Sequence, residues 1–262
     1  MTSDADGGTD AETGAGDAIP FVGAGPGDPR LITVAGRDAL AAADLVVHAG
    51  SLVNPAVVDT HAPDADRFDS AGRDLDEIVD RMVEAHRAGR AVVRLHSGDP
   101  GIYGATVEQR AALADRGIDT YVVPGVTAAS AASAALDAPL TLPGVANHVA
   151  ITRPAGRTLD RDDEHVSTFV GLGDVTTCLY LGTGAIADVA DRLLADGVDP
   201  ATPVAIVYHA SWPDERVIET TIDRMADRVA DADFDRSALV VIRATTAESA
   251  ERSVLYDDWP DP

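Results

Sequence analysis

The chain of 262 residues contains no lysine, and all twenty of its basic residues are arginines. Without a lysine amine, a Schiff base with pyridoxal phosphate or with a substrate carbonyl is excluded. A Walker-type phosphate loop requires its lysine and is excluded as well. The absence of this one residue type therefore removes two large classes of enzyme.

Cysteine and clustered histidine are also scarce. Cys178 is the only cysteine, so the chain has neither an internal disulfide nor a cysteine-based zinc cage. The seven histidines are scattered, with no HExxH motif and no pair at helical spacing. We therefore expect no metal site.

Long apolar runs are missing too. Charge or glycine interrupts every hydrophobic stretch before eighteen residues, so we predict no membrane span. Residues 1–18 are acidic and glycine-rich, without the basic and apolar regions of a secretion signal. We interpret residues 1–18 and 248–262 as solvated acidic tails, and the protein as cytoplasmic.

Positive charge is scarce relative to negative charge. The formal net charge is −24, with 44 acidic side chains against 20 basic ones. Such a surface repels nucleic acid and anionic membranes, so we expect neither as a partner. Molar salt shortens the Debye length to about 3 Å and screens this self-repulsion. The charge favours the cytoplasm of a halophile, and we expect activity to require high salt.

Short β-branched runs alternate with longer helical patterns along the chain. This alternation indicates crossover units and a mostly parallel sheet. The expected strands are 19–22, 45–48, 91–96, 120–123, 149–152, 177–181, 204–208 and 239–242. The expected helices are 31–43, 74–88, 104–116, 186–195 and 221–230.

The pattern predicts an α/β protein of two α/β domains with mixed, mostly parallel sheets. We place the N-terminal domain at 19–140 and the C-terminal domain at 141–247. In open α/β sheets, ligands bind outside the carboxyl ends of the strands. Four loops rich in glycine, proline, aspartate or serine follow predicted strands and are therefore candidate binding loops.

The first loop, GAGPGDP at 23–29, superficially resembles a dinucleotide fingerprint. The third glycine of GxGxxG would fall on Asp28, and a carboxylate there opposes a pyrophosphate. The loop thus argues against a nicotinamide or flavin cofactor. A tight turn between strand and helix is the alternative interpretation.

The other three loops each have a binding and a structural interpretation. In HSGDP (96–100), Gly98 allows a ligand to approach the backbone and Asp99 can accept hydrogen bonds, but the same residues suit an ordinary turn. In PGVTA (124–128), small residues leave room for a flat ring or simply begin a helix. In YHASWPDE (208–215), Trp212 either binds a ligand or covers the core.

The loops together are more specific than each alone. GAGPGDP, HSGDPGIYGA (96–105), VPGVTAASAA (123–132), LYLG (179–182) and VAIVYHASWPDE (204–215) occur in this order. Over nearly all of residues 19–245 the chain resembles the tetrapyrrole methylase family. HAGSLV (48–53), LTLP (140–143) and YHASWPDE resemble the branch that methylates C11 of precorrin-4 or cobalt-precorrin-4 on the pathway to vitamin B12.

The resemblance implies S-adenosyl-L-methionine (SAM) as cofactor, bound between the two domains, S-adenosyl-L-homocysteine (SAH) as product, and a homodimer. The implied cofactor-binding residues are Pro26, Ser97, Gly98, Asp99, Ile102, Thr127, Ala128, Leu181, Ala210 and Ala238. The first domain would supply those up to Ala128, and the second domain the rest.

The implied substrate is a small-molecule tetrapyrrole with several carboxylates. Arg30, Arg153 and Arg157 are candidates to hold these groups, or alternatively neutralise neighbouring aspartates. Asp28 and Tyr103 are candidates to move a proton or align the ring. Alternatively, Asp28 caps the following helix and Tyr103 is a packing residue. No triad and no catalytic metal are expected.

Three other functions are compatible with parts of the pattern. A relative could methylate another acceptor, such as the protein side chain of a diphthine synthase or a ribosomal RNA ribose. A non-catalytic protein could use the same loops to bind SAM or a corrinoid. A nicotinamide-dependent oxidoreductase is opposed by Asp28.

Overall fold

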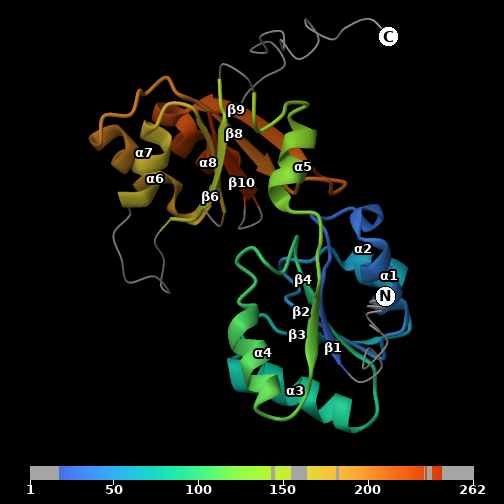
Figure 1. Ribbon diagram of the computed structural model, residues 1–262. Helices are drawn as coiled ribbons and strands as arrows, with labels where there is room; N and C mark the ends of the chain where they lie inside the picture. Colours follow the sequence, from blue (N-terminus) through green and yellow to red (C-terminus); the bar gives the residue numbers. More distant parts are fainter. Residues whose placement is uncertain are drawn as a thin grey trace, which may run out of the picture. The chain divides into compact units, whose positions relative to one another are not determined.

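The computed structural model describes residues 18–142, 145–154, 164–180, 183–232, 234 and 238–243. It divides the chain into two compact units (Figure 1). Unit 1 contains the described residues up to Ala24 together with Pro29–Gly125. Unit 2 contains Gly25–Asp28 and the described residues from Val126 onward. Each unit is built around one five-stranded sheet.

Unit 1 has an entirely parallel sheet in the order β3-β2-β4-β1-β5. Its strands are β1 (Ile19–Gly23), β2 (Leu45–His48), β3 (Asp66–Asp69), β4 (Val92–His96) and β5 (Thr120–Val123). Buried side chains alternate between the two faces of this sheet, because both faces are covered by helices. The predicted crossover units are thus present in unit 1.

The helices of unit 1 form one layer on each face of the sheet. The first pair, α1 (Val34–Ala41) and α2 (Pro55–His61), packs on Val22, Val46 and Val93. The second pair, α3 (Leu75–Arg87) and α4 (Thr106–Ala114), packs on Phe21, Val47 and Val92 (Figure 1). The predicted helix at 31–43 divides into a short 3-10 turn, Pro29–Leu31, and α1.

Helix α3 follows the predicted span closely because its start and stop signals are local. Asp74 accepts a hydrogen bond from the backbone of Glu77, and the Glu77 side chain accepts one from the backbone of Asp74. The helix ends before Gly89, whose φ of 75° suits the left-handed position after a helix. A capping box and a glycine therefore delimit α3.

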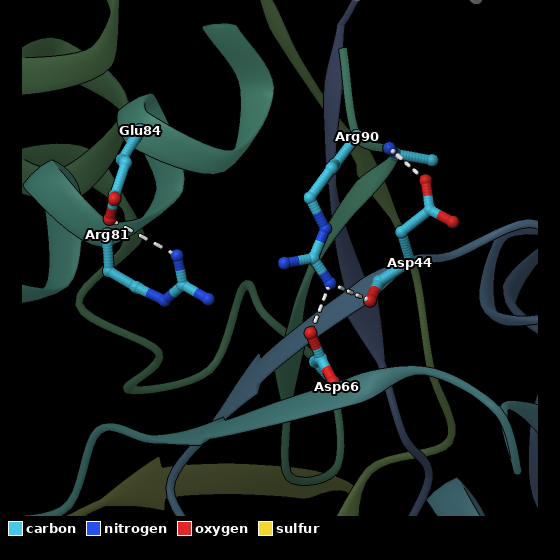
Figure 2. Close-up of polar contacts among 6 residues, drawn as sticks. Asp44, Asp66, Arg81, Glu84 and Arg90 are labelled. Atoms are coloured by element: carbon cyan, nitrogen blue, oxygen red, sulfur yellow. Dashed lines mark hydrogen bonds and ion pairs between the residues drawn. The ribbon is translucent and has the colours of Figure 1, made fainter. Parts of the chain in front are cut away.

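The amino-terminal ends of three strands in unit 1 are held by Arg90 (Figure 2). Its Nη2 donates to the Asp66 carboxylate and to the Asp44 carbonyl, each at 2.6 Å. The Asp44 carboxylate accepts the Ala91 N–H at 2.8 Å. Figure 2 also shows the Arg81–Glu84 pair within α3. These contacts connect β2, β3 and β4 at their starts, so the opposite ends of the strands carry the candidate loops.

Unit 2 has a mixed sheet in the order β6-β7-β10-β8-β9. Its strands are β6 (His148–Thr152), β7 (Val175–Leu179), β8 (Pro203–Tyr208), β9 (Arg216–Thr221) and β10 (Ala238–Ile242). Only β6 and β7 pair in parallel among these strands. The predicted class of two α/β domains is confirmed, with antiparallel pairs predominating in this unit. Strand β9, which we did not predict, forms a hairpin with β8.

The helices of unit 2 also lie on both faces of its sheet. One face holds α5 (Ala128–Ala135), which packs on Cys178, Ala205 and Leu239. The other face holds α6 (Glu164–Gly171), α7 (Ile186–Ala195) and α8 (Met225–Ala232) (Figure 1). The contact of α5 with β10 places this helix in unit 2, whereas the sequence division at residue 140 assigns it to the first domain. No helix in the described part of the chain has the length and hydrophobicity to cross a membrane.

Candidate functional site

Three glycines of unit 1 meet at the carboxyl ends of neighbouring strands. Gly23 ends β1, while Gly98 and Gly125 follow β4 and β5. A Cβ on Gly125 would lie 2.1 Å from the Gly98 carbonyl oxygen and 2.8 Å from the Gly23 Cα. A Cβ on Gly23 would lie 2.6 Å from the same oxygen. The backbones are therefore too close for a side chain at Gly23 or Gly125.

The Asp99 carboxylate joins the loops after β4 and β5. Its Oδ1 accepts a hydrogen bond from the Gly101 N–H at 2.7 Å, and its Oδ2 accepts one from the Gly125 N–H at 2.8 Å. Bonds between backbone N–H groups and a carboxylate are among the stronger hydrogen bonds in proteins. Each carboxylate oxygen can accept more than one hydrogen bond, so the predicted hydrogen bonds from a ligand to Asp99 stay a prediction.

The loop between β4 and α4 is folded back on itself. The Ile102 N–H donates to the Asp99 carbonyl at 3.1 Å. Tyr103 and Ala105 have left-handed φ angles of 54° and 47°, and a Cβ on Gly104 would lie 2.4 Å from the Pro100 carbonyl oxygen. The loop is therefore tightly folded, with its backbone in close contact with itself.

Among the predicted site residues of this loop, Ser97 is exposed, Ile102 is half-buried and Tyr103 is 42% exposed. The exposure of Tyr103 disfavours the interpretation of this residue as part of the core.

Two polar side chains are buried in β4 directly before this loop. Arg94 is 6% exposed and His96 is 7% exposed. Burial, with the nearby charge of Arg94, lowers the pKa of His96 to about 3, so its ring is neutral at neutral pH. We predicted 91–96 as a strand, and the structure adds that Arg94 and His96 are buried within it.

In unit 2, the glycine-rich loop at 25–28 packs against the loop that connects β8 to β9. The indole Nε1 of Trp212 donates to the Pro26 carbonyl at 2.8 Å. The Asp28 N–H donates to the Ser211 hydroxyl at 3.0 Å. A Cβ on Gly27 would lie 1.9 Å from Cδ1 of the indole ring. Trp212 therefore covers this glycine-rich loop.

Asp28 does not cap helix α1. The N-cap of this helix is Thr33, whose hydroxyl accepts the Gly36 N–H at 3.2 Å. The main-chain N–H of Asp28 donates to the Ser211 hydroxyl.

A stack of rings fixes the 208–215 loop. The His209 ring lies between Tyr208 and Trp212, with centroid distances of 3.8 Å and 4.3 Å. Its Nδ1 is 3.0 Å from the Asp214 carboxylate, and this hydrogen bond lowers the pKa of Asp214. His209 and Ser211 both have left-handed φ angles, 48° and 69°. These contacts hold an otherwise unfavourable backbone conformation.

Small residues predicted to contact the cofactor lie in the same part of unit 2. Ala238 pairs with Tyr208 across the sheet, and Ala210 belongs to the same buried cluster as the first turn of α5. Thr127 caps α5 by accepting the Ser130 N–H at 3.3 Å, and Ala128 begins the helix. The structure therefore assigns Thr127 and Ala128 to unit 2, not to the first domain.

The remaining predicted residues belong to different units or lie outside the described residues. Arg30 is exposed on the 3-10 turn of unit 1, and Arg153 is half-buried directly after β6 in unit 2. Leu181 and Arg157 lie outside the described residues. The role of each remains a prediction.

Residues 18–226 match the model of the protein family described as Tetrapyrrole (Corrin/Porphyrin) Methylases. The chain belongs to the tetrapyrrole methylase family. This tetrapyrrole methylase is 43% identical over 240 residues to the cobalt-precorrin-4 C(11)-methyltransferase of Methanocaldococcus jannaschii, covering 91% of this chain and 92% of that protein. It is 39% identical over 245 residues to the precorrin-4 C(11)-methyltransferase of Pseudomonas aeruginosa, covering 91% and 94%.

Solved structures of relatives share the architecture of this tetrapyrrole methylase. A cobalt precorrin-4 methyltransferase matches with a TM-score of 0.80 and 37% identity, over 87% of this chain and 95% of that one. The uroporphyrin-III C-methyl transferase from Thermus thermophilus, complexed with S-adenyl homocysteine, matches with a TM-score of 0.71 and 30% identity, over 86% and 91%. The predicted family and fold are confirmed.

Proposed function

We propose that this tetrapyrrole methylase transfers a methyl group from SAM to C11 of precorrin-4 or cobalt-precorrin-4 in cobalamin biosynthesis. The observation that carries the proposal is the 43% identity, over 91% of the chain, to an enzyme named for this reaction. Relatives named for the metal-free substrate are 39% identical, so both forms of the ring belong to the proposal. We also propose that the protein forms a homodimer and works in a salt-adapted cytoplasm.

The side chains proposed to hold SAM fit its chemistry. None of them is positively charged, so none repels a sulfonium ion. Ala128, Ala210 and Ala238 are small and apolar, while Ser97 supplies an exposed hydroxyl. The other proposed contacts are Pro26, Gly98, Asp99, Ile102, Thr127 and Leu181. When bound, SAM supplies an electrophilic methyl group on a positively charged sulfur.

The proposed contribution of the protein to catalysis is orientation. Holding a ring carbon in line with the methyl group lowers the barrier, by up to about 7–11 kcal/mol in favourable model systems. The backbone contacts at Gly23, Gly98 and Gly125 supply the rigidity that such alignment requires. We propose Asp28 and Tyr103 as the groups that accept a proton or align the ring.

Arginine is proposed to recognise the substrate carboxylates. The chain has no lysine, and the guanidinium group can bind a carboxylate through two parallel hydrogen bonds. Arg30, Arg153 and Arg157 are the proposed contacts.

Mass spectrometry tests the reaction directly. Cobalt-precorrin-4, generated in situ, is incubated with the protein and SAM in molar KCl, with a parallel reaction that omits SAM. We expect a product heavier by one methyl group, with fragmentation that places the methyl at C11, only when SAM is present. Unchanged mass despite measured SAM binding would contradict the proposed acceptor. It would favour a diphthine synthase-like acceptor or a non-catalytic SAM- or corrinoid-binding protein.

The salt requirement has its own test. With a net charge of −24, the protein repels a polycarboxylate substrate, and screening weakens this repulsion. We expect the methylation rate at fixed substrate to rise with KCl concentration into the molar range. Circular dichroism at each concentration separates loss of folding from weaker substrate binding. A maximal rate in dilute buffer would contradict this proposal.

A further inference from the structure

A buried pair of side chains connects the two ends of the loop between β4 and α4. Arg94 precedes the loop and Gln109 lies in the first turns of α4, after it. The Arg94 Nε donates to the Gln109 Oε1 at 2.8 Å, and its Nη1 donates to the Val47 carbonyl at 3.0 Å. Arg94 and Gln109 are each 6% exposed. The loop is therefore joined at its base to strand β2.

Gln109 also forms a hydrogen bond with the loop itself. Its Nε2 donates to the Ala105 carbonyl at 3.2 Å. Ala105 is the N-cap of α4 but has left-handed angles, φ 47° and ψ 42°, and no side-chain capping bond. Left-handed alanine is unfavourable and persists only where its surroundings hold it. The bond from Gln109 is one contact that does so.

Stability alone does not account for this pair. Burial lowers the pKa of Arg94 to about 10, which shows how poorly its charge is solvated. No carboxylate pairs with Arg94 in the described residues. Packed apolar side chains of similar volume are often at least as stabilising as buried charged groups. The polar pair instead restrains geometry, because each hydrogen bond fixes the position and orientation of the group that it binds.

We propose that Gln109, held by Arg94, is a positioning residue that sets the Tyr103–Ala105 turn and so the cofactor-binding conformation of the 97–102 loop. This inference rests on the proposed function, because Ser97, Asp99 and Ile102 are its proposed cofactor contacts. Gln109 acts through the backbone and does not touch the cofactor.

The replacement Gln109→Glu separates positioning from stability. Glutamate retains the volume and the bond to Arg94, and gives the buried guanidinium a counter-ion. It also replaces the amide donor with an oxygen that repels the Ala105 carbonyl. We expect a melting temperature equal to or above that of the wild type, together with a dissociation constant for SAH raised on the order of tenfold. Isothermal titration calorimetry with SAH measures the affinity.

Thr120→Val is the matched control. Thr120, in β5, accepts a hydrogen bond at 3.0 Å from the Nε of Arg110, which lies on α4 like Gln109. Its loss should lower the melting temperature and leave the SAH affinity unchanged. Gln109→Glu with wild-type affinity, or equal losses of affinity in both variants, would overturn the positioning role alone. Wild-type protein that binds no SAH would overturn the proposed function and this inference with it.

Discussion

Replacement of Gly125 by alanine is expected to raise the dissociation constant for SAH on the order of a hundredfold. The new methyl group would lie 2.1 Å from the Gly98 carbonyl oxygen, which is backbone and has no alternative rotamer. The loops after β1, β4 and β5 would have to separate, and the Gly125 N–H would lose its bond to Asp99. Overpacking of this kind should also lower the free energy of unfolding, by about 3 kcal/mol.

Calorimetry with SAH and urea unfolding measure these two effects. Gly171→Ala is the control, because a Cβ at this last residue of α6 meets nothing within 4 Å. We expect it to change the free energy of unfolding by less than about 1 kcal/mol and to leave SAH binding intact. A Gly125→Ala protein that binds SAH like the wild type would show that the contact of the three loops is not needed for the site.

Trp212→Ala is expected to have the second largest effect. The change removes the hydrogen bond to the Pro26 carbonyl, the stacking on His209 and the packing on Gly27. We expect a loss of about 3 kcal/mol in the free energy of unfolding. The SAH dissociation constant should rise at least about tenfold, because Pro26 and Ala210 lie in the two loops that lose their contact.

Trp212→Phe is the graded comparison for this position. Phenylalanine retains an aromatic ring beside His209 but cannot donate to Pro26, so the expected loss is about 1 kcal/mol. Thermal unfolding and calorimetry with SAH should rank wild type, Trp212→Phe and Trp212→Ala in that order. Equal affinity in all three proteins would contradict the proposed role of the 208–215 loop in the site.

Prediction succeeded where the determining signals lie close together in the chain. The span of α3 follows from Asp74, Glu77 and Gly89, which all lie within the helix or next to its ends. Four of the five strands of unit 1 were predicted from alternating strand and helix patterns, whereas β3 and α2 were not. The parallel direction follows because a crossover helix brings the chain back to begin the next strand in the same direction. The four candidate loops were likewise visible at strand ends from their glycine, proline, aspartate and serine residues, although their role in binding stays a prediction.

Prediction was incomplete where pairing connects distant residues. Strand β9 has no continuous apolar run and is recognisable mainly as the hairpin partner of β8. The antiparallel pairing of β10 between β7 and β8 depends on contacts that no local pattern encodes. Helix α5 is rich in alanine and could pack with either unit by composition, and its contacts with β10 decide the matter.

The amino-acid order alone indicated the family, the α/β class and the candidate loops, since these depend on residue type and on spacing along the chain. Only the tertiary structure decided which hydrogen-bond partners the polar side chains have. It directs both Asp99 oxygens to backbone N–H groups, places the indole of Trp212 on Pro26, and buries Arg94 against Gln109. Apart from the local Asp99–Gly101 bond, these contacts join residues that approach only when strands and loops assemble. Hydrogen-bond direction and backbone separation are properties of that assembly, not of the local sequence.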